Sequence, residues 1–271
     1  SLAPDTPASA KTYLAAWLAV GGCLRGLEAM LTGTCDACFA LVRPPGHHAL
    51  PNRVSGFCIF NNLAITARFA AKRYGFQRIL IVDWDIHHGH GLNDLFFEEK
   101  GVFYFSSHDT LLYPYTGDWC DVGEGEGRGY TVNIPLPREM EDPDMLSLYE
   151  RTLGPIILGY KPELILVAAG FDAHRDDPVG RSRLTESVFG DLTRLVLRLG
   201  AEIGQPPLLL ALEGGYAPPG LARCVREVLL ALLQEKGAKR PVAPRTARAS
   251  ELVSQAREAH APFAVWTDVP A

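Results

Sequence analysis

The sequence predicts an α/β protein built on one mostly parallel central sheet with helices on both faces. Short apolar runs alternate with longer helical stretches along the chain, a pattern typical of parallel strands joined by helical crossovers. Clusters of polar residues directly follow these apolar runs, as expected where ligands bind at the carboxyl ends of strands. A chain of 271 residues can hold one large α/β domain or two small ones. The continuous alternation favours a single domain over residues 1–271.

The first part of the chain is predicted to form two helices and one strand. Ala- and Leu-rich content predicts a helix over residues 9–31. A strand over 39–43 follows and is ended by a Pro-Pro-Gly sequence. Asn61 or Asn62 is placed to cap a second helix, which reaches about residue 74.

The middle of the chain is predicted to contribute three strands, a short helix and a long loop. The apolar run over residues 79–82 is typical of a strand buried on both faces. A short helix over 93–100 and a strand over 102–107 follow. Residues 108–129 are rich in Gly, Tyr and acidic side chains, so they are predicted to form a surface loop. A further strand is predicted over 130–136.

The last part of the chain continues the alternation. A helix is predicted over residues 144–160, with Pro155 as the point at which it would break in two. A strand over 164–169 precedes an amphipathic helix over 185–203, for which Thr185 is a cap candidate. The remaining predicted elements are a strand over 208–212 and helices over 221–234 and 250–259.

The composition is that of a soluble protein. Hydrophobic residues make up 47% of the chain and charged residues 21%, which favours a substantial core. A formal net charge of −5 gives no reason to expect direct binding to nucleic acid. We find no secretory signal and no apolar run long enough to cross a bilayer, so we expect no membrane association and a cytoplasmic location. The sequence leaves a homo-oligomer open.

The six cysteines show no spacing typical of a secreted disulfide framework. Cys35 and Cys38 form a C-x-x-C, a spacing found in redox sites and in halves of zinc sites. No second C-x-x-C or suitable histidine pair follows it. We therefore expect buried, reduced cysteines, as in a reducing cytosol.

Polar side chains at the end of the strand over 79–82 are predicted to share one face. Asp83, Asp85 and His87 alternate with apolar residues, and alternate residues of a strand point the same way. Asp172 follows a later strand and adds a second carboxylate beside Asp85. Two carboxylates and one imidazole with an open position are typical of a catalytic zinc, although Fe(II), Mn(II) or Co(II) would also accept these ligands. For each aspartate alone, helix capping stays an alternative.

Two further groups would complete a hydrolytic site. His47 and His48 follow a different strand, where adjacent imidazoles can take and give a proton. Tyr216 follows two glycines and can donate a hydrogen bond to a developing oxyanion. Each feature alone has an ordinary structural explanation. Together they indicate metal-assisted hydrolysis of an amide.

Five motifs occur in chain order: Arg43-Pro-Pro-Gly-His-His48, Gly56-Phe-Cys-Ile-Phe-Asn-Asn62, Asp83-Trp-Asp-Ile-His-His-Gly89, Ala169-Gly-Phe-Asp172 and Leu212-Glu-Gly-Gly-Tyr216. With these motifs the sequence resembles the histone deacetylase and acetylpolyamine amidohydrolase family, which has the arginase-deacetylase fold. The residues within the motifs resemble those of class II and bacterial members more than those of class I.

The resemblance implies roles for the site residues. It implies one zinc ion per chain, held by Asp85, His87 and Asp172. It makes His47 and His48 the general base and its acid or electrostatic partner, with Asp83 orienting His47, and it makes Tyr216 the donor that polarises the carbonyl. The residues implied to line or border an acyl-lysine channel are Asp5, Gly56, Phe57 and Tyr113.

The resemblance also implies two structural monovalent cations, K⁺ or Na⁺, held partly by main-chain carbonyls. The residues implied for the first cation are Asp83, Asp85, His87, Ser106 and Ser107. The residues implied for the second cation are Phe96, Glu99, Val102 and Tyr130.

The sequence departs from the family pattern in three places. His90 stands where the family usually has Asp or Asn in contact with the second catalytic histidine. The family's earlier N-terminal part, including a sheet strand, is expected to be absent. Val179 is apolar where polyamine-selective relatives can carry an acidic gatekeeper.

The first hypothesis is therefore a zinc-dependent deacetylase that removes acetyl or related acyl groups from lysine side chains of a peptide or protein. The second hypothesis is deacetylation of a small acetylated amine such as an acetylpolyamine. An arginase-like ureohydrolase would need a further carboxylate where Gly89 stands. A non-catalytic protein that binds acyl-lysine is the alternative from another class.

Overall fold

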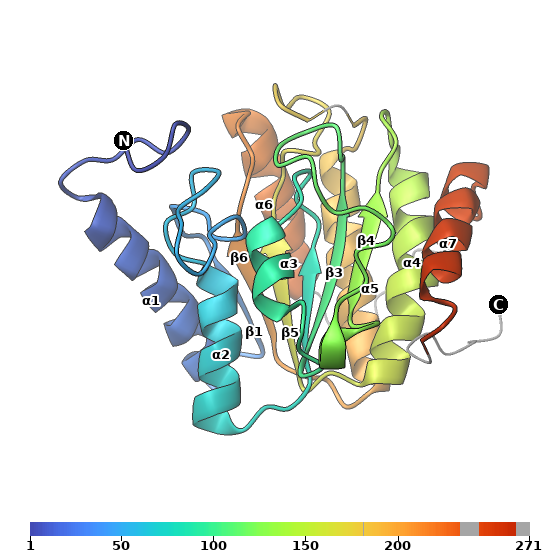
Figure 1. The fold of residues 1–271 in the computed structure, drawn as a ribbon, viewed down its shortest axis with the longest axis horizontal. Coiled ribbons are helices and arrows are strands. Elements are labelled where there is room, and N and C mark those ends of the chain that lie inside the picture. Colours follow the sequence, from blue (N-terminus) through green and yellow to red (C-terminus); the bar gives the residue numbers. More distant parts are fainter. Residues whose placement is uncertain (181, 234–243, 264–271) are drawn as a thin grey trace. The chain divides into compact units, whose positions relative to one another are not determined.

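The computed structural model describes residues 1–180, 182–233 and 244–263 (Figure 1). The chain consists of two compact units. The first unit holds the whole sheet and the first three helices. The second unit holds the last four of the seven helices found among the described residues. The first unit comprises Ser1–Pro135, Pro162–Gly170 and Pro207–Gly214; the second comprises Leu136–Lys161, Phe171–Pro206 and Gly215–Ala271.

The sheet confirms the predicted α/β class, and every strand pair in it is parallel. Its six strands are arranged in the order β1-β6-β5-β2-β3-β4. They are β1 (Ala37–Ala40), β2 (Ile79–Asp83), β3 (Val102–His108), β4 (Thr131–Pro135), β5 (Leu164–Ala169) and β6 (Leu208–Leu212). Because all strands run the same way, their carboxyl ends meet at one edge of the sheet, where polar side chains follow several of them.

The register places Asp83 at the centre of that edge. Asp83, the last residue of β2, lies opposite Ser106 of β3 on one side and Ala168 of β5 on the other. The five residues of β2 are all buried, as expected for a strand with neighbours on both sides. The buried apolar strands therefore bring buried polar residues together at the carboxyl edge of the sheet.

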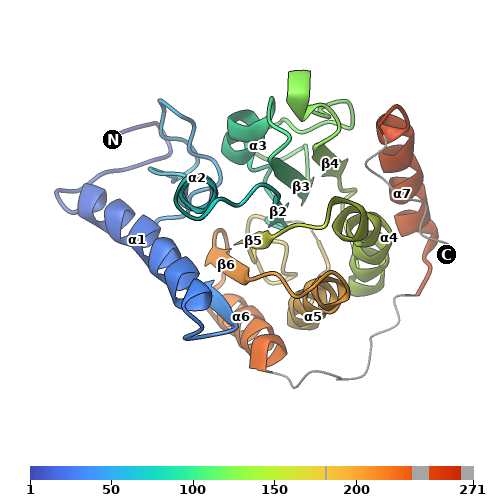
Figure 2. The ribbon, with the colours of Figure 1, turned by 90° about the horizontal axis from the view of Figure 1, so that it is seen from below.

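Three helices belong to the first unit. They are α1 (Thr12–Leu31), α2 (Asn62–Tyr74) and α3 (His90–Phe96). Figure 2 shows α1 and α2 side by side, and buried residues of both belong to one core cluster with alternate residues of β2, β5 and β6. The side chain of Asn61 accepts a hydrogen bond from the backbone N–H of Ala64, which confirms the predicted cap of α2.

The second unit is built from α4 (Asp142–Tyr160), α5 (Glu186–Glu202), α6 (Pro218–Leu233) and α7 (Ala247–His260). Helix α5 packs against both α4 and α6, and α7 packs against α4. Thr185 caps α5 by accepting from the backbone N–H of Ser187, as its position in the sequence predicted. Pro155 lies inside α4 without dividing it, so the expected break is wrong.

Several boundaries differ from the prediction. Strand β1 covers Ala37–Ala40 rather than residues 39–43, and α3 starts at His90 rather than at residue 93. The long loop after β3 contains a short 3₁₀ helix, Gly125–Gly127. Apolar content predicted these elements correctly, but their ends depend on turns that the apolar pattern does not show.

Helix α1 corrects the expectation that no apolar run is long enough to cross a bilayer. Its 20 residues meet that test by length and composition, with 39% of the apolar window buried. A core helix of a soluble protein passes the same test, and Cys23, Leu27 and Met30 of α1 belong to the core cluster. The finding is therefore weak support for a membrane span.

All six cysteines are free, as expected, but they are not all buried. Cys35 and Cys38 are half-buried and Cys120 is exposed. Burial raises the pKa of the Cys23 thiol to about 12, with smaller contributions from Glu213 and Cys38.

Candidate functional site

The first histidine of the pair is held by a buried carboxylate. Nδ1 of His47 lies 3.1 Å from Oδ2 of Asp83, and neither side chain is exposed. The hydroxyl of Tyr104 donates to the same oxygen at 3.0 Å. Burial opposes a charge on His47, but the carboxylates of Asp83, Asp85 and Glu213 outweigh it and raise its pKa to about 10. Asp83 therefore orients His47, and the surrounding carboxylates stabilise its protonated form.

The neighbouring carboxylate, that of Asp85, accepts hydrogen bonds from backbone N–H groups and lies close to two imidazoles. The backbone N–H of Gly214 donates to its Oδ2 at 2.8 Å, and the backbone N–H of His87 donates to its Oδ1 at 2.9 Å. Nδ1 of His87 lies 3.0 Å from Oδ1, and Nε2 of His47 lies 3.9 Å from Oδ2. Burial alone would raise the pKa of Asp85, but His47 and His87 hold it well below its usual range.

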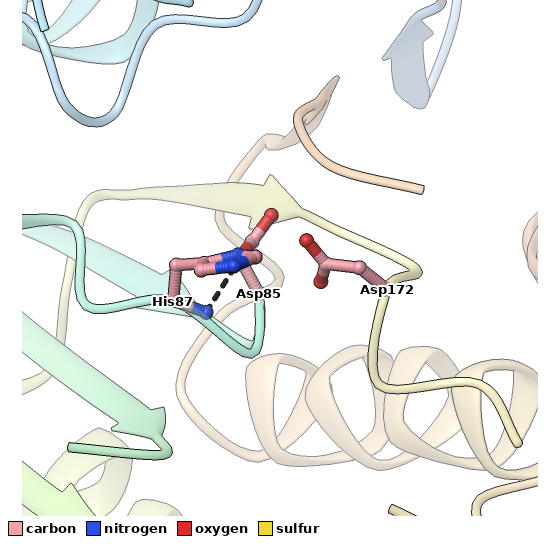
Figure 3. A group of neighbouring side chains, drawn as sticks. All are labelled: Asp85, His87 and Asp172. Carbon is pink, nitrogen blue, oxygen red and sulfur yellow. Dashed lines mark hydrogen bonds and ion pairs between the residues drawn. The ribbon is translucent and has the colours of Figure 1, made fainter. Parts of the chain in front are cut away.

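Asp85, His87 and Asp172 form the candidate metal group (Figure 3). All three are buried, and their ligand atoms lie within 4.8 Å of one another. Asp172 is placed by the chain itself, because it follows β5 by three residues and β5 pairs with β2. The sequence predicted this trio from strand ends alone.

The donor set fits a divalent cation. Two carboxylates and one imidazole are the ligand types of a catalytic zinc site. Buried carboxylates that face one another are costly unless a cation or proton neutralises them. Gly170 also leaves room for Asp85 there, because a Cβ at that position would collide with the Asp85 carboxylate. Zinc and other divalent cations that accept oxygen and nitrogen ligands fit this donor set.

Glu213 is a buried residue that the motif included but to which no role was assigned. Its Oε2 accepts the backbone N–H groups of Gly46 at 2.7 Å and of His47 at 3.1 Å. Its other oxygen has no hydrogen-bond partner among the described residues. Burial raises its pKa to about 7, although His47 and the two N–H donors work against that shift. An acidic residue directly after an apolar strand was the signal that marked it.

The second histidine has a different environment. Burial and the charge of His47 hold the pKa of His48 well below its usual range. Its Nδ1 lies 3.2 Å from Nδ1 of His90, the residue that departs from the family pattern. The contact that the resemblance implied at this position is therefore present, with an imidazole in place of a carboxylate or amide.

The residues predicted for the channel lie together on the first unit. Oδ2 of Asp5 accepts the backbone N–H of Gly56 at 3.2 Å, and Thr6 accepts the N–H of Phe57 at 3.2 Å. The ring of Tyr113 meets the ring of His48 edge-on, with centroids 5.1 Å apart. Phe57 is 47% exposed, as a wall residue at an opening would be. The structure thus brings Asp5, Gly56, Phe57 and Tyr113 near one another, and their contact with a substrate stays a prediction.

The residues predicted to hold monovalent cations are partly engaged in other contacts. Ser106 and Ser107 are buried, and Oγ of Ser106 bonds Nδ1 of His108 at 2.8 Å. The carboxylate of Glu99 pairs with the guanidinium of Arg68. Both cation sites, including Phe96, Val102 and Tyr130, stay predictions that would use main-chain oxygens.

Tyr216 belongs to the second unit. Its backbone N–H donates to Oδ2 of Asp177 at 2.6 Å, and Asp177 also accepts the N–H of Ala217 at 3.3 Å. This carboxylate fixes the turn from which the Tyr216 side chain projects. The predicted role of its hydroxyl stays a prediction.

Comparison with known proteins identifies relatives over most of the chain. Histone deacetylase 14, chloroplastic, of Arabidopsis thaliana is 38% identical over 235 residues, 85% of this chain and 56% of that protein. A probable deacetylase of Archaeoglobus fulgidus is 38% identical over 216 residues, 80% of this chain and 60% of that protein. Polyamine deacetylase HDAC10 of Homo sapiens is 39% identical over 259 residues, 93% of this chain and 38% of that protein.

The chain spans between 38% and 60% of the length of these relatives. Among solved structures, the crystal structure of the HDA15 HD domain matches with a TM-score of 0.89 and 33% identity. The match covers 97% of this chain and 72% of that one. The family model described as the histone deacetylase domain matches residues 1–232, and the chain belongs to this family.

Proposed function

We propose that this chain is a zinc-dependent amidohydrolase that removes acetyl or related acyl groups from lysine side chains of a peptide or protein. One observation carries the proposal: Nε2 of His47 lies 3.9 Å from a carboxylate of the candidate metal group, while its Nδ1 is held by Asp83. An imidazole nitrogen is thus fixed next to the predicted metal ligands. Family membership supports the same chemistry.

Each site residue would have a separate role in the hydrolysis. Zinc, when bound, would polarise the substrate carbonyl and lower the pKa of the attacking water. The charge of the bound cation would oppose protonation of His47, and Nε2 of the neutral imidazole would then take the proton of that water, while Asp83 holds Nδ1 and stabilises the charge that results. His48, which its surroundings keep neutral, would lie beside the leaving amine, and the hydroxyl of Tyr216 would donate to the carbonyl oxygen.

The test is hydrolysis of an acetyl-lysine peptide by the chain after removal of metal and after reloading with zinc. We expect no turnover without metal, restored turnover with zinc, and neither zinc binding nor turnover in the Asp172→Ala variant. Glu98→Gln, an exposed change outside the site, is the matched control. Full activity of the metal-free chain would contradict the proposal.

A small acetylated amine is the second candidate substrate. Its support is that relatives named polyamine deacetylase HDAC10 match at 39% identity in human and 44% in rat. Val179 weighs against it, because a cationic polyamine is better recognised by an acidic side chain than by an apolar one. Rates on an acetyl-lysine peptide and on an acetylpolyamine should favour the peptide, and Val179→Glu should shift the ratio towards the polyamine. A preference of the unmodified chain for the polyamine would reverse the assignment.

An arginase-like site with two metals fits this chain poorly. The extra carboxylate would have to replace Gly89, and a Cβ there would collide with the Asp83 carboxylate and lie 2.7 Å from the Tyr104 hydroxyl. The space that a side chain at residue 89 would need is therefore occupied by Asp83 and Tyr104. We propose one zinc per chain.

A non-catalytic protein that binds acyl-lysine would retain the channel without turnover. Saturable binding of an acetyl-lysine peptide by the zinc-loaded chain, with no release of acetate, would support that alternative. A cytoplasmic location, the absence of membrane and nucleic-acid binding, and a possible homo-oligomer stay predictions. The structural K⁺ or Na⁺ ions belong to the same group of predictions.

A further inference from the structure

Hydrogen bonds link the predicted channel wall to the second histidine of the site. Nδ1 of His48 lies 3.2 Å from Nδ1 of His90, and Nε2 of His90 lies 3.4 Å from Oγ of Ser55. Oγ of Ser55 in turn bonds the hydroxyl of Tyr113. All four residues belong to the first unit, and we call them the His48–Tyr113 chain.

The same residues pack tightly around one another. The ring of Tyr113 stands edge-on to His48 at 5.1 Å and 84°, and to His90 at 5.9 Å and 82°. Next to Ser55, Gly56 has a φ of 53°, and a Cβ on it would collide with the His48 ring. The hydroxyl of Tyr113 therefore has a hydrogen-bond partner within the protein, and its ring forms part of the predicted wall.

The direction of the hydrogen bonds determines which ring nitrogen of His48 carries the proton. Burial, with the charge of His47, lowers the pKa of His90 to about 4, so at neutral pH its ring carries a single N–H. With the proton on Nδ1, His90 donates to His48 and must accept from Ser55 at Nε2. With the proton on Nε2, it donates to Ser55 and accepts from His48 at Nδ1. The two directions leave opposite nitrogens of His48 protonated.

We propose that Ser55, His90 and Tyr113 are positioning residues that set the ring orientation and tautomer of His48 through the His48–Tyr113 chain. The catalytic consequence rests on the proposed function, in which His48 lies beside the leaving amine. In the usual family pattern, an Asp or Asn side chain contacts this histidine. Here His90 links His48 to the hydroxyls of Ser55 and Tyr113. Hydrogen bonds therefore connect the predicted channel wall with His48.

The kinetic test is a double-mutant cycle on the two hydroxyls. Tyr113→Phe keeps the aromatic wall and Ser55→Ala removes one oxygen, and each should lower kcat about 10-fold with KM nearly unchanged. The double variant should be no slower than either single variant, because both changes interrupt the same chain. Tyr115→Phe, at a residue that is 72% exposed in the same loop, is the matched control and should change neither constant.

A second comparison separates hydrogen bonding from space filling. His90→Asn retains a donor and an acceptor in a smaller volume, whereas His90→Leu retains the volume without either. If the His48–Tyr113 chain positions His48, the Asn variant should keep more activity than the Leu variant. Both variants should bind one zinc per polypeptide. Greater activity of the Leu variant would show that His90 only fills space.

A measurement without substrate keeps the proposal independent of activity. In the chain labelled with ¹⁵N-histidine, long-range ¹H–¹⁵N NMR correlations report the protonation of each ring nitrogen. We expect Ser55→Ala and Tyr113→Phe to shift the ring nitrogens of both His48 and His90, and Tyr115→Phe to leave them unchanged.

Two results would overturn the proposal: unchanged His48 resonances in both hydroxyl variants, or kinetic effects that multiply to about 100-fold in the double variant. If the wild-type chain hydrolyses no acylated amine, the proposed function fails. The NMR comparison still decides whether the hydrogen bonds control His48.

Discussion

Nδ1 of His47 lies 3.1 Å from Oδ2 of Asp83, and that oxygen also accepts the hydroxyl of Tyr104 at 3.0 Å. Two donors on one buried carboxylate oxygen hold it in a single orientation. The imidazole is held with it, so its other nitrogen faces Asp85. The order of these contacts, carboxylate to imidazole to metal ligand, is typical of a general base with a fixed tautomer.

The first prediction concerns this pair. Asp83→Asn replaces an acceptor that can stabilise the charged imidazole by a neutral amide. We expect kcat on an acetyl-lysine peptide to fall by about 10²–10⁴-fold, since general base catalysis contributes about that much. The zinc content, measured by mass spectrometry of the protein's metals, should stay at one per chain. An Asp83→Asn enzyme with wild-type kcat would show that His47 needs no carboxylate.

The second prediction concerns metal stoichiometry. The candidate group offers three ligand atoms within 4.8 Å, and Gly89 cannot accept the further carboxylate of a two-metal site. Equilibrium dialysis with zinc should therefore give one ion per chain, and His87→Ala should give none at the same concentration. Two ions per chain in the wild type would reopen the ureohydrolase alternative.

The third prediction concerns Glu213 and stability. Its Oε2 accepts the backbone N–H groups of Gly46 and His47, which have no water to replace it in a buried position. Glu213→Leu should lower the free energy of unfolding by about 2–4 kcal/mol, because two buried donors lose their acceptor. Glu213→Gln retains a carbonyl oxygen and should cost less.

Urea denaturation of the metal-free chain, followed by circular dichroism, compares the two Glu213 variants directly. Equal losses in the Leu and Gln variants would mean that the charge of Glu213, rather than its oxygen as an acceptor, matters.

The fourth prediction concerns pH and His260 on α7. Burial lowers the pKa of His260 to about 4 from its ordinary 6.5. Between these values the unfolded chain binds the proton and the folded chain does not, so stability falls as the pH drops from 6.5 towards 4. At about 1.4 kcal/mol per pH unit, this residue would account for up to about 3 kcal/mol.

The measurement is the free energy of unfolding by urea across that pH range. His260→Leu replaces the imidazole by an apolar side chain of similar size next to Phe263, whose ring centroid lies 6.0 Å from that of His260. The variant should lose less stability on acidification than the wild type. Parallel pH curves for the two proteins would show that His260 does not titrate as its burial implies.

Much of the fold follows from local sequence. The apolar runs of β2, β5 and β6 are long enough for a buried strand and too short for most helices, so their positions were predicted within a residue. The caps at Asn61 and Thr185 were predicted because their side chains bond backbone groups only two or three residues away. By contrast, α4 continues through Pro155, because tertiary packing of its buried face outweighs one missing hydrogen bond.

By itself the sequence determined the α/β class, the strand-end motifs and the trio Asp85, His87 and Asp172, since period and spacing along the chain specify them. Tertiary structure alone decided the support around the site. Glu213 holds the backbone at His47 from 166 residues away, and His90, Ser55 and Tyr113 join in one chain of hydrogen bonds. These contacts link residues distant in sequence, and burial gives them their pKa shifts. The family resemblance implied the contact of His90 with His48. The local sequence gives no signal for the other contacts or for the pKa shifts, because both arise only when the sheet and its loops are assembled.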